Sequence, residues 1–178
     1  MIGKDNKYDA VIVGAGVSGL FMFHKLRNMG LSVLVIEKSD ELGGTWNWNR
    51  YPGARCDIPS LEYSYQFDED LQQEWNWSEK YSAGPEILEY LNHVAEKFDL
   101  KDYINFEEEV IQAKFNEDSC LWSVSTNKQK YVAKFCIFAT GCLSIPNKPE
   151  IPGLESFEGK LLHTATWPRE EQNFTDKN

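Results

Sequence analysis

The residues best suited to chemistry form a glycine pattern near the N-terminus. Gly14, Gly16 and Gly19 have the spacing GxGxxG, between an apolar run and a segment with helical periodicity. In such a turn the first glycine allows the tight bend, the second lets a phosphate approach the backbone, and the third lets helix and strand pack closely. Glu37 ends a second apolar run, where a carboxylate can hydrogen-bond an adenosine ribose. Together these features predict a dinucleotide site.

Other candidate residues lie in an irregular segment from Leu42 to Asp70, which is rich in glycine, proline and aromatic residues. Loops of this length are usually functional. The segment opens with a glycine pair a few residues after the second apolar run. The tripeptide ATG at positions 139–141 follows the last apolar run, at 130–138. Both marks are typical of flavoenzymes with two dinucleotide-binding domains, so they favour FAD at the first site.

The elements that must position these residues can be predicted from periodicity and turn chemistry. We expect strands at 10–13, 32–36, 104–114, 121–126 and 130–138, and helices at 16–30 and 85–98. The last two strands flank Asn127 and Lys128, a plausible hairpin turn. The fold class expected is α/β: a Rossmann-like FAD/NAD(P)-binding fold in three β/β/α layers, with a parallel sheet and a β-meander, truncated. From Pro146 onward we expect a loop.

The composition of the chain limits the classes of partner that it can bind. The chain has 178 residues, a formal net charge of −10 and a pI of about 4.8, which argues against nucleic acid or an anionic membrane. The four cysteines form no CxxC pair or Cys/His cluster, so we predict no metal site and free thiols in a reducing compartment. Without a long apolar run or a signal peptide, the expected location is cytoplasmic. The acidic runs DED and EEE are interpreted as solvated faces.

Two longer segments carry a family resemblance. GGTWNWNRYPGARCDIPSLEYSYQF and FEGKLLHTATWP resemble the N-terminal part of type I Baeyer–Villiger monooxygenases, most of all the phenylacetone and cyclohexanone monooxygenase group. The second segment matches that family's fingerprint, FxGxxxHxxxWP, at Phe157, Gly159, His163, Trp167 and Pro168. Flavin monooxygenases that oxygenate nitrogen or sulfur have a similar fingerprint ending in a different aromatic residue. Trp167 therefore favours the Baeyer–Villiger branch.

The resemblance implies a reaction in which NADPH reduces FAD and O₂ then converts a ketone to an ester or lactone. It also implies roles for individual residues. The cofactor-binding set would be Gly14, Gly16, Gly19, Glu37, Gly44, Thr45, Trp46, Asn47, Trp48, Arg55, Cys56, Asp57, Tyr63 and Val110. Thr45 to Trp48 would line the flavin, although the family commonly has a tyrosine at the place of Asn47. Val110 would meet the adenine side through its backbone, and the loop from Arg55 to Asp57 would also meet the nicotinamide.

Asp57 is the catalytic candidate, because in the family this aspartate holds an arginine that stabilises negative charge on the oxygenated flavin. None of the four arginines of this chain stands at that arginine's position. The competing interpretation of Asp57 is a loop carboxylate that caps a turn before Pro59. For His163 the competing interpretation is a hydrogen-bonded structural histidine, and we assign His163 and Trp167 a linker role.

By this resemblance residues 1–145 form the N-terminal part of an FAD-binding domain. Residues 146–178 form a linker toward an NADPH-binding domain outside this sequence. We therefore expect a fragment that is inactive alone and binds FAD weakly or not at all, with the remaining C-terminal part as its partner. Two alternatives stay open: a monooxygenase acting on nitrogen or sulfur, and a non-catalytic dinucleotide-binding module.

Overall fold

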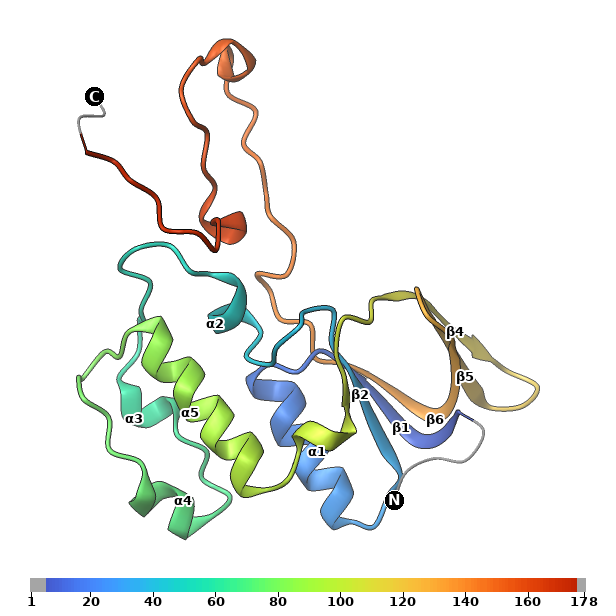
Figure 1. Cartoon of the computed structure of the whole chain (residues 1–178). Helices are drawn as coiled ribbons and strands as arrows, with labels where there is room; N and C mark the ends of the chain where they lie inside the picture. The colour runs from blue at the N-terminus through green and yellow to red at the C-terminus, as the bar shows by residue number, and fades with distance from the viewer. Residues whose placement is uncertain (1–5, 176–178) are drawn as a thin grey trace.

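A six-stranded sheet lies at the centre of the computed structural model, which describes residues 6–175 (Figure 1). Its order is β3-β2-β1-β6-β5-β4. The strands are β1 (Lys7–Val13), β2 (Val33–Ile36), β3 (Ile104–Asn105), β4 (Val110–Asn116), β5 (Leu121–Thr126) and β6 (Lys130–Phe138). β3, β2, β1 and β6 run parallel, whereas β6, β5 and β4 form an antiparallel meander. The predicted parallel sheet with a β-meander is confirmed.

Two longer helices accompany the sheet, α1 (Val17–Asn28) and α5 (Gly84–Lys97). α1 begins directly after the glycine turn and is followed by Gly30, whose φ of +79° is accessible to glycine without strain. α5 has Pro85 in its first turn, where the missing N–H loses no hydrogen bond. The shorter helices are α2 (Thr45–Trp48), α3 (Ser60–Tyr63), α4 (Glu69–Glu74), η1 (Lys101–Tyr103), η2 (Leu154–Ser156) and η3 (Thr164–Thr166).

The strands contribute to two separate cores because successive side chains of a strand point to opposite faces. On the helix side, Ala10 and Ile12 of β1 pack in one cluster with side chains of α1 and α5. On the other side, Val11 packs with Val124 of β5 and Tyr131 of β6. The helices therefore cover one face of the parallel strands and the meander covers the other. This is the predicted three-layer arrangement.

The predicted strand at 104–114 is in fact two strands with different partners. Ile104 and Asn105 extend the parallel sheet beside β2, while the chain from Val110 pairs with β5. Between them the backbone turns, and Glu107 has a φ of +54°. Apolar residues lie on both sides of the three glutamates at 107–109, and nothing in this pattern marks the change of partner. The predicted irregular segment at 42–70 likewise contains α2, α3 and the start of α4, which are too short to show a period.

The C-terminal part of the described chain leaves the sheet after β6. Residues 139–175 contain only η2 and η3 as regular elements; in Figure 1 this segment runs outward and then returns toward α2. No helix within residues 6–175 has the length and apolar character needed to cross a membrane. The four cysteines are free thiols, with Cys56 buried.

Candidate dinucleotide-binding site

The glycine turn is built so tightly that two of its positions have no room for a side chain. Gly14 has a φ of +105°, and a Cβ there would lie 2.7 Å from the backbone oxygen of Ala139. A Cβ on Gly19 would lie 1.9 Å from the backbone oxygen of Gly14. The first and third glycines therefore have the turn and packing roles that the motif predicts.

The second glycine meets the glycine pair that follows β2. A Cβ on Gly16 would lie 3.4 Å from the Cα of Gly44. The N–H of Gly43 donates to the backbone oxygen of Ala15 at 2.9 Å, and Gly43 and Gly44 have φ angles of +119° and +53°. On the other side, the N–H of Ala139 donates to Val13 at 2.8 Å. Three segments far apart in the sequence thus converge on one turn.

This turn opens α1 with unpaired donors. Gly16 is the N-cap and provides no side-chain cap, and the first turn of the helix contains no acidic residue. The first N–H groups of a helix have no intrahelical partner, and the helix dipole places partial positive charge there. An anionic group such as a pyrophosphate fits this arrangement.

Glu37 is the acidic residue beside the turn, and it is only 5% exposed. Its carboxylate accepts hydrogen bonds from the backbone N–H of Ala15 at 2.7 Å and from that of Ser39 at 2.8 Å. Glu37 therefore also fixes the glycine turn, a structural role that its position in the motif does not reveal. Each carboxylate oxygen can accept a further hydrogen bond, so the group can still bind a ribose hydroxyl.

Two of the predicted loop residues pack together. The ring of Trp46 in α2 packs edge-on against the ring of Tyr63 in α3, with centroids 5.6 Å apart. Burial raises the pKa of Tyr63, with smaller contributions from Cys56 and Asp57. Asp57 itself is exposed. The loop thus holds an aromatic pair, and the Tyr63 hydroxyl is within electrostatic reach of the candidate catalytic carboxylate.

Asn47 lies differently from its α2 neighbours. It is 2% exposed, and its Nδ2 donates to the Oγ of Ser39 at 2.6 Å and to the backbone oxygen of Glu41 at 3.2 Å. Arg50 donates to both the backbone and the side-chain oxygen of Asn47. The Asn47 side chain therefore anchors its own loop. Trp48, by contrast, is 44% exposed, and Thr45 is half-buried.

The remaining predicted cofactor residues occupy the loop after α2 and the start of β4. Arg55 donates from Nη1 to Glu79 and to the backbone oxygen of Tyr81, both at 2.8 Å, and Cys56 beside it is buried. Val110 pairs with Thr126 in the meander. The backbone N–H of Glu108, two residues before Val110, donates to the backbone oxygen of Glu37, which holds the start of β4 near the end of β2.

The fingerprint residues lie in the C-terminal segment. His163 Nδ1 accepts from the N–H of Ala165 at 3.1 Å, so Nε2 carries the proton and donates to the backbone oxygen of Asn147 at 3.1 Å. Phe157 is 60% exposed, and its ring lies over Gly159, where a Cβ would be 2.4 Å away. These contacts match the structural interpretation of His163 as a hydrogen-bonded loop residue.

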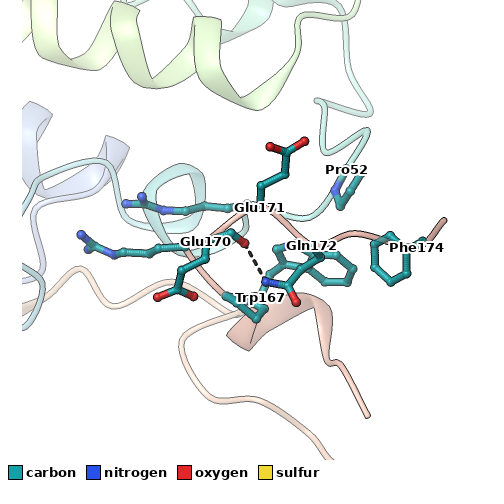
Figure 2. Close-up of a pocket in the computed structure, with 9 residues that line it drawn as sticks. Pro52, Trp167, Glu170, Glu171, Gln172 and Phe174 are labelled. Carbon is teal, nitrogen blue, oxygen red and sulfur yellow. Dashed lines mark hydrogen bonds between the residues drawn. The ribbon is translucent and has the colours of Figure 1, made fainter. Parts of the chain in front are cut away.

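Arg169, directly after the fingerprint, holds this segment on the loop that follows β2. Its guanidinium donates to both carboxylate oxygens of Asp40, at 2.8 and 2.5 Å. Arg169, but not Asp40, also lines a hollow of about 310 Å³. Figure 2 shows Trp167, Pro52 and Phe174 around it. The hollow contains no residue of the glycine turn, so it is separate from the dinucleotide site.

Residues 11–175 match the family described as pyridine nucleotide-disulphide oxidoreductase. The chain belongs to this family.

Three proteins similar to this chain are monooxygenases by name. An acetone monooxygenase (methyl acetate-forming) of Gordonia sp. is 44% identical over 170 residues, 95% of this chain and 32% of that protein. A phenazine N-monooxygenase of Lysobacter antibioticus is 39% identical over 171 residues, 94% of this chain and 32% of that protein. The crystal structure of cyclohexanone monooxygenase from Rhodococcus sp. Phi1, bound to NADP⁺, is 47% identical with a TM-score of 0.88, covering 95% of this chain and 32% of that one.

These findings confirm the predicted resemblance and the predicted fold. The chain spans about a third of the length of the relatives it matches. Ala139, the first residue of the ATG mark, packs against Gly14, a contact that the sequence did not predict. Glu108 is buried although the acidic run was interpreted as a solvated face. That interpretation is wrong for Glu108, and nothing in three consecutive glutamates distinguishes the buried one.

Proposed function

We propose that this chain binds FAD through the glycine turn and Glu37. We further propose that it is the FAD-binding part of a monooxygenase that uses NADPH and O₂ to convert ketones to esters or lactones. One observation carries the cofactor assignment: the backbones of Gly14, Gly44 and Ala139 converge at an uncapped helix start, beside a buried carboxylate. A cradle of backbone donors with no side chains in it fits a pyrophosphate.

The residue roles proposed are those that the family resemblance implies. The N–H groups at the start of α1 hold the pyrophosphate, and Glu37 accepts from the adenosine ribose. The start of β4 at Val110 meets the adenine side, while Trp46 and Tyr63 face the isoalloxazine. When bound, FAD supplies the redox and oxygen-transfer chemistry, and the protein binds and orients it. Asp57, in the same irregular loop, is assigned the task of holding a catalytic arginine.

The reaction proposed is the one that an acetone monooxygenase forming methyl acetate performs by name, a ketone-to-ester conversion. Its balance is ketone, O₂, NADPH and a proton giving ester, water and NADP⁺. Because the chain spans about a third of such relatives, we assign this activity to a protein that contains this chain together with an NADPH-binding part. The free thiols support a cytoplasmic location.

Oxygenation of a nitrogen atom is the second candidate, supported by the 39% identity to a phenazine N-monooxygenase over the same residues. The two candidates differ in product, an ester from a ketone or an N-oxide from an aromatic nitrogen heterocycle. Mass spectrometry of products from a protein carrying this chain and its NADPH-binding part separates them. A non-catalytic dinucleotide-binding module would form neither.

The cofactor assignment can be tested with Gly16→Ala. Gly16 has a φ of −84°, which alanine adopts without strain, and the added Cβ only reaches ordinary contact with Gly44. The fold should therefore tolerate the change, while the methyl group enters the phosphate cradle. We expect the free energy of unfolding to change by less than about 1 kcal/mol. Binding of FAD and ADP, measured by calorimetry, should weaken about tenfold or more.

Met29→Ala is the matched control, because Met29 lies at the far end of the same helix and is 72% exposed. It should leave the binding of both ligands unchanged. Equal affinity of the wild-type chain and Gly16→Ala for FAD would contradict the proposed site. A bound flavin spectrum that NADPH does not bleach would place the nicotinamide site outside this chain, whereas bleaching would place one within it.

A further inference from the structure

Glu108 is a buried carboxylate with neutral partners. It is 2% exposed, and a buried carboxylate is unfavourable unless its oxygens are hydrogen-bonded. Oε1 accepts from the hydroxyl of Thr126 at 2.6 Å and from that of Tyr131 at 2.9 Å. Oε2 accepts from Nδ2 of Asn105 at 3.0 Å and from Tyr131 at 3.1 Å. Three donor groups thus satisfy this carboxylate, with the single Tyr131 hydroxyl proton shared between its two oxygens.

The donors come from three different strands. Asn105 ends β3 in the parallel layer, whereas Thr126 and Tyr131 belong to β5 and β6 of the meander. Burial and the hydrogen bond to Glu108 raise the pKa of Tyr131 to about 12, so its hydroxyl keeps its proton and donates. Glu108 therefore ties the meander to the parallel sheet where the chain crosses between the layers.

The backbone of the same segment encloses Glu37. The backbone N–H of Glu108 donates to the backbone oxygen of Glu37 at 2.9 Å. The backbone N–H of Glu37 donates to the backbone oxygen of Asn105 at 2.9 Å. The N–H of Glu107 donates to Ser39 at 2.8 Å, although Glu107 has a φ of +54°, which is unfavourable for a side-chain-bearing residue. Such a turn persists only where its surroundings hold it, and the Glu108 carboxylate supplies four of the contacts that do so.

We propose that Glu108 is a positioning residue for the dinucleotide site: by fixing the 105–108 segment, it sets the direction from which the Glu37 carboxylate meets the ribose. This inference rests on the proposed ribose role of Glu37. The neighbouring Glu109 provides a matched control. It has the same charge, but it is exposed enough to pair with Lys38 at the surface, at 2.7 Å.

Glu108→Gln keeps the shape of the side chain and replaces one acceptor oxygen by an NH₂ donor. On the Oε2 side this donor would face the Nδ2 donor of Asn105, and on the Oε1 side it would face two hydroxyl groups that now donate. Either orientation loses at least one hydrogen bond of the network. The segment should then release its hold on the backbone of Glu37.

The experiment measures ADP and 2′-deoxy-ADP binding to the full chain by calorimetry, in the wild type, Glu108→Gln and Glu109→Gln. A carboxylate that accepts from a ribose hydroxyl should favour ADP over the deoxy ligand by about tenfold. We expect Glu108→Gln to reduce this ratio to about threefold or less, as Glu37→Gln should, and Glu109→Gln to preserve it. The free energy of unfolding is measured for every variant.

The ratio separates positioning from stability, because a purely structural role lowers the stability of Glu108→Gln without changing the preference of its folded fraction. A wild-type ratio near one would overturn the ribose role of Glu37, and this inference with it. A wild-type ratio that Glu108→Gln retains would overturn this inference alone. If Glu108→Gln does not fold, Thr126→Val removes one donor to Glu108, and an unchanged ratio in that variant is equally decisive.

Discussion

The most direct test of the glycine turn is Gly19→Ala. This substitution increases helix propensity but introduces a steric clash in the packing of the turn. Gly19 lies in the first turn of α1, where alanine would favour the helix by about 1 kcal/mol. The added Cβ would, however, lie 1.9 Å from the backbone oxygen of Gly14. Ordinary contacts begin near 3.4 Å, so the turn and helix must separate by 3.4 − 1.9 = 1.5 Å.

This separation meets resistance on both sides. Gly14 donates to Ile36 at 2.8 Å, and Ala15 donates to the Glu37 carboxylate at 2.7 Å, so the turn is fixed to β2. Overpacking typically costs about 1–3 kcal/mol. Each lost hydrogen bond adds about 1 kcal/mol. Subtracting the propensity gain leaves a destabilisation of about 3 kcal/mol, a large part of a typical domain's stability.

Urea unfolding followed by circular dichroism measures this change, with Ser18→Ala as the control. Ser18 is the preceding residue of the same helix turn and is exposed, so its replacement should stabilise the chain by about 0.5 kcal/mol. If Gly19→Ala were within about 1 kcal/mol of Ser18→Ala, the tight packing described here would be refuted.

Two further predictions concern the surface. Hydrogen bonds from Arg169 are the main cause that lowers the pKa of Asp40 to about 2. The ion pair therefore holds the C-terminal segment against the loop after β2 above about pH 4, and this effect is lost as the pH falls toward 2. In Arg169→Gln the pKa of Asp40 should rise toward 3.8, as measured by carboxyl-carbon NMR titration, and an unchanged pKa would contradict the ion pair. Phe135 and Phe138 are 57% and 58% exposed on β6, which β5 accompanies only as far as Ala133, so this edge should promote self-association. Replacing both by serine should weaken association about tenfold in sedimentation experiments, while Met29→Ser at an isolated exposed position should not.

Much of the fold could be predicted from the sequence because its signals are local. The strands at 121–126 and 130–138 have the predicted bounds, since alternation and a turn between them depend only on neighbouring residues. The same holds for the glycine turn, where φ and the absence of a Cβ are properties of single positions. Apolar runs, glycines and the fingerprint were sufficient to predict the family.

Only the tertiary structure decided which side chains are hydrogen-bonded to each other and which strands pair. The sequence of Glu107, Glu108 and Glu109 does not tell which carboxylate is buried, because this depends on Thr126 and Tyr131 from strands that fold back over the sheet. The sequence at 104–114 does not tell where β3 ends, because β3 and β4 lie at opposite edges of the sheet, β3 beside β2 and β4 beside β5. Local chemistry sets the conformation of a segment, but hydrogen-bond donors and neighbouring strands come from distant residues, and only the folded chain brings them together.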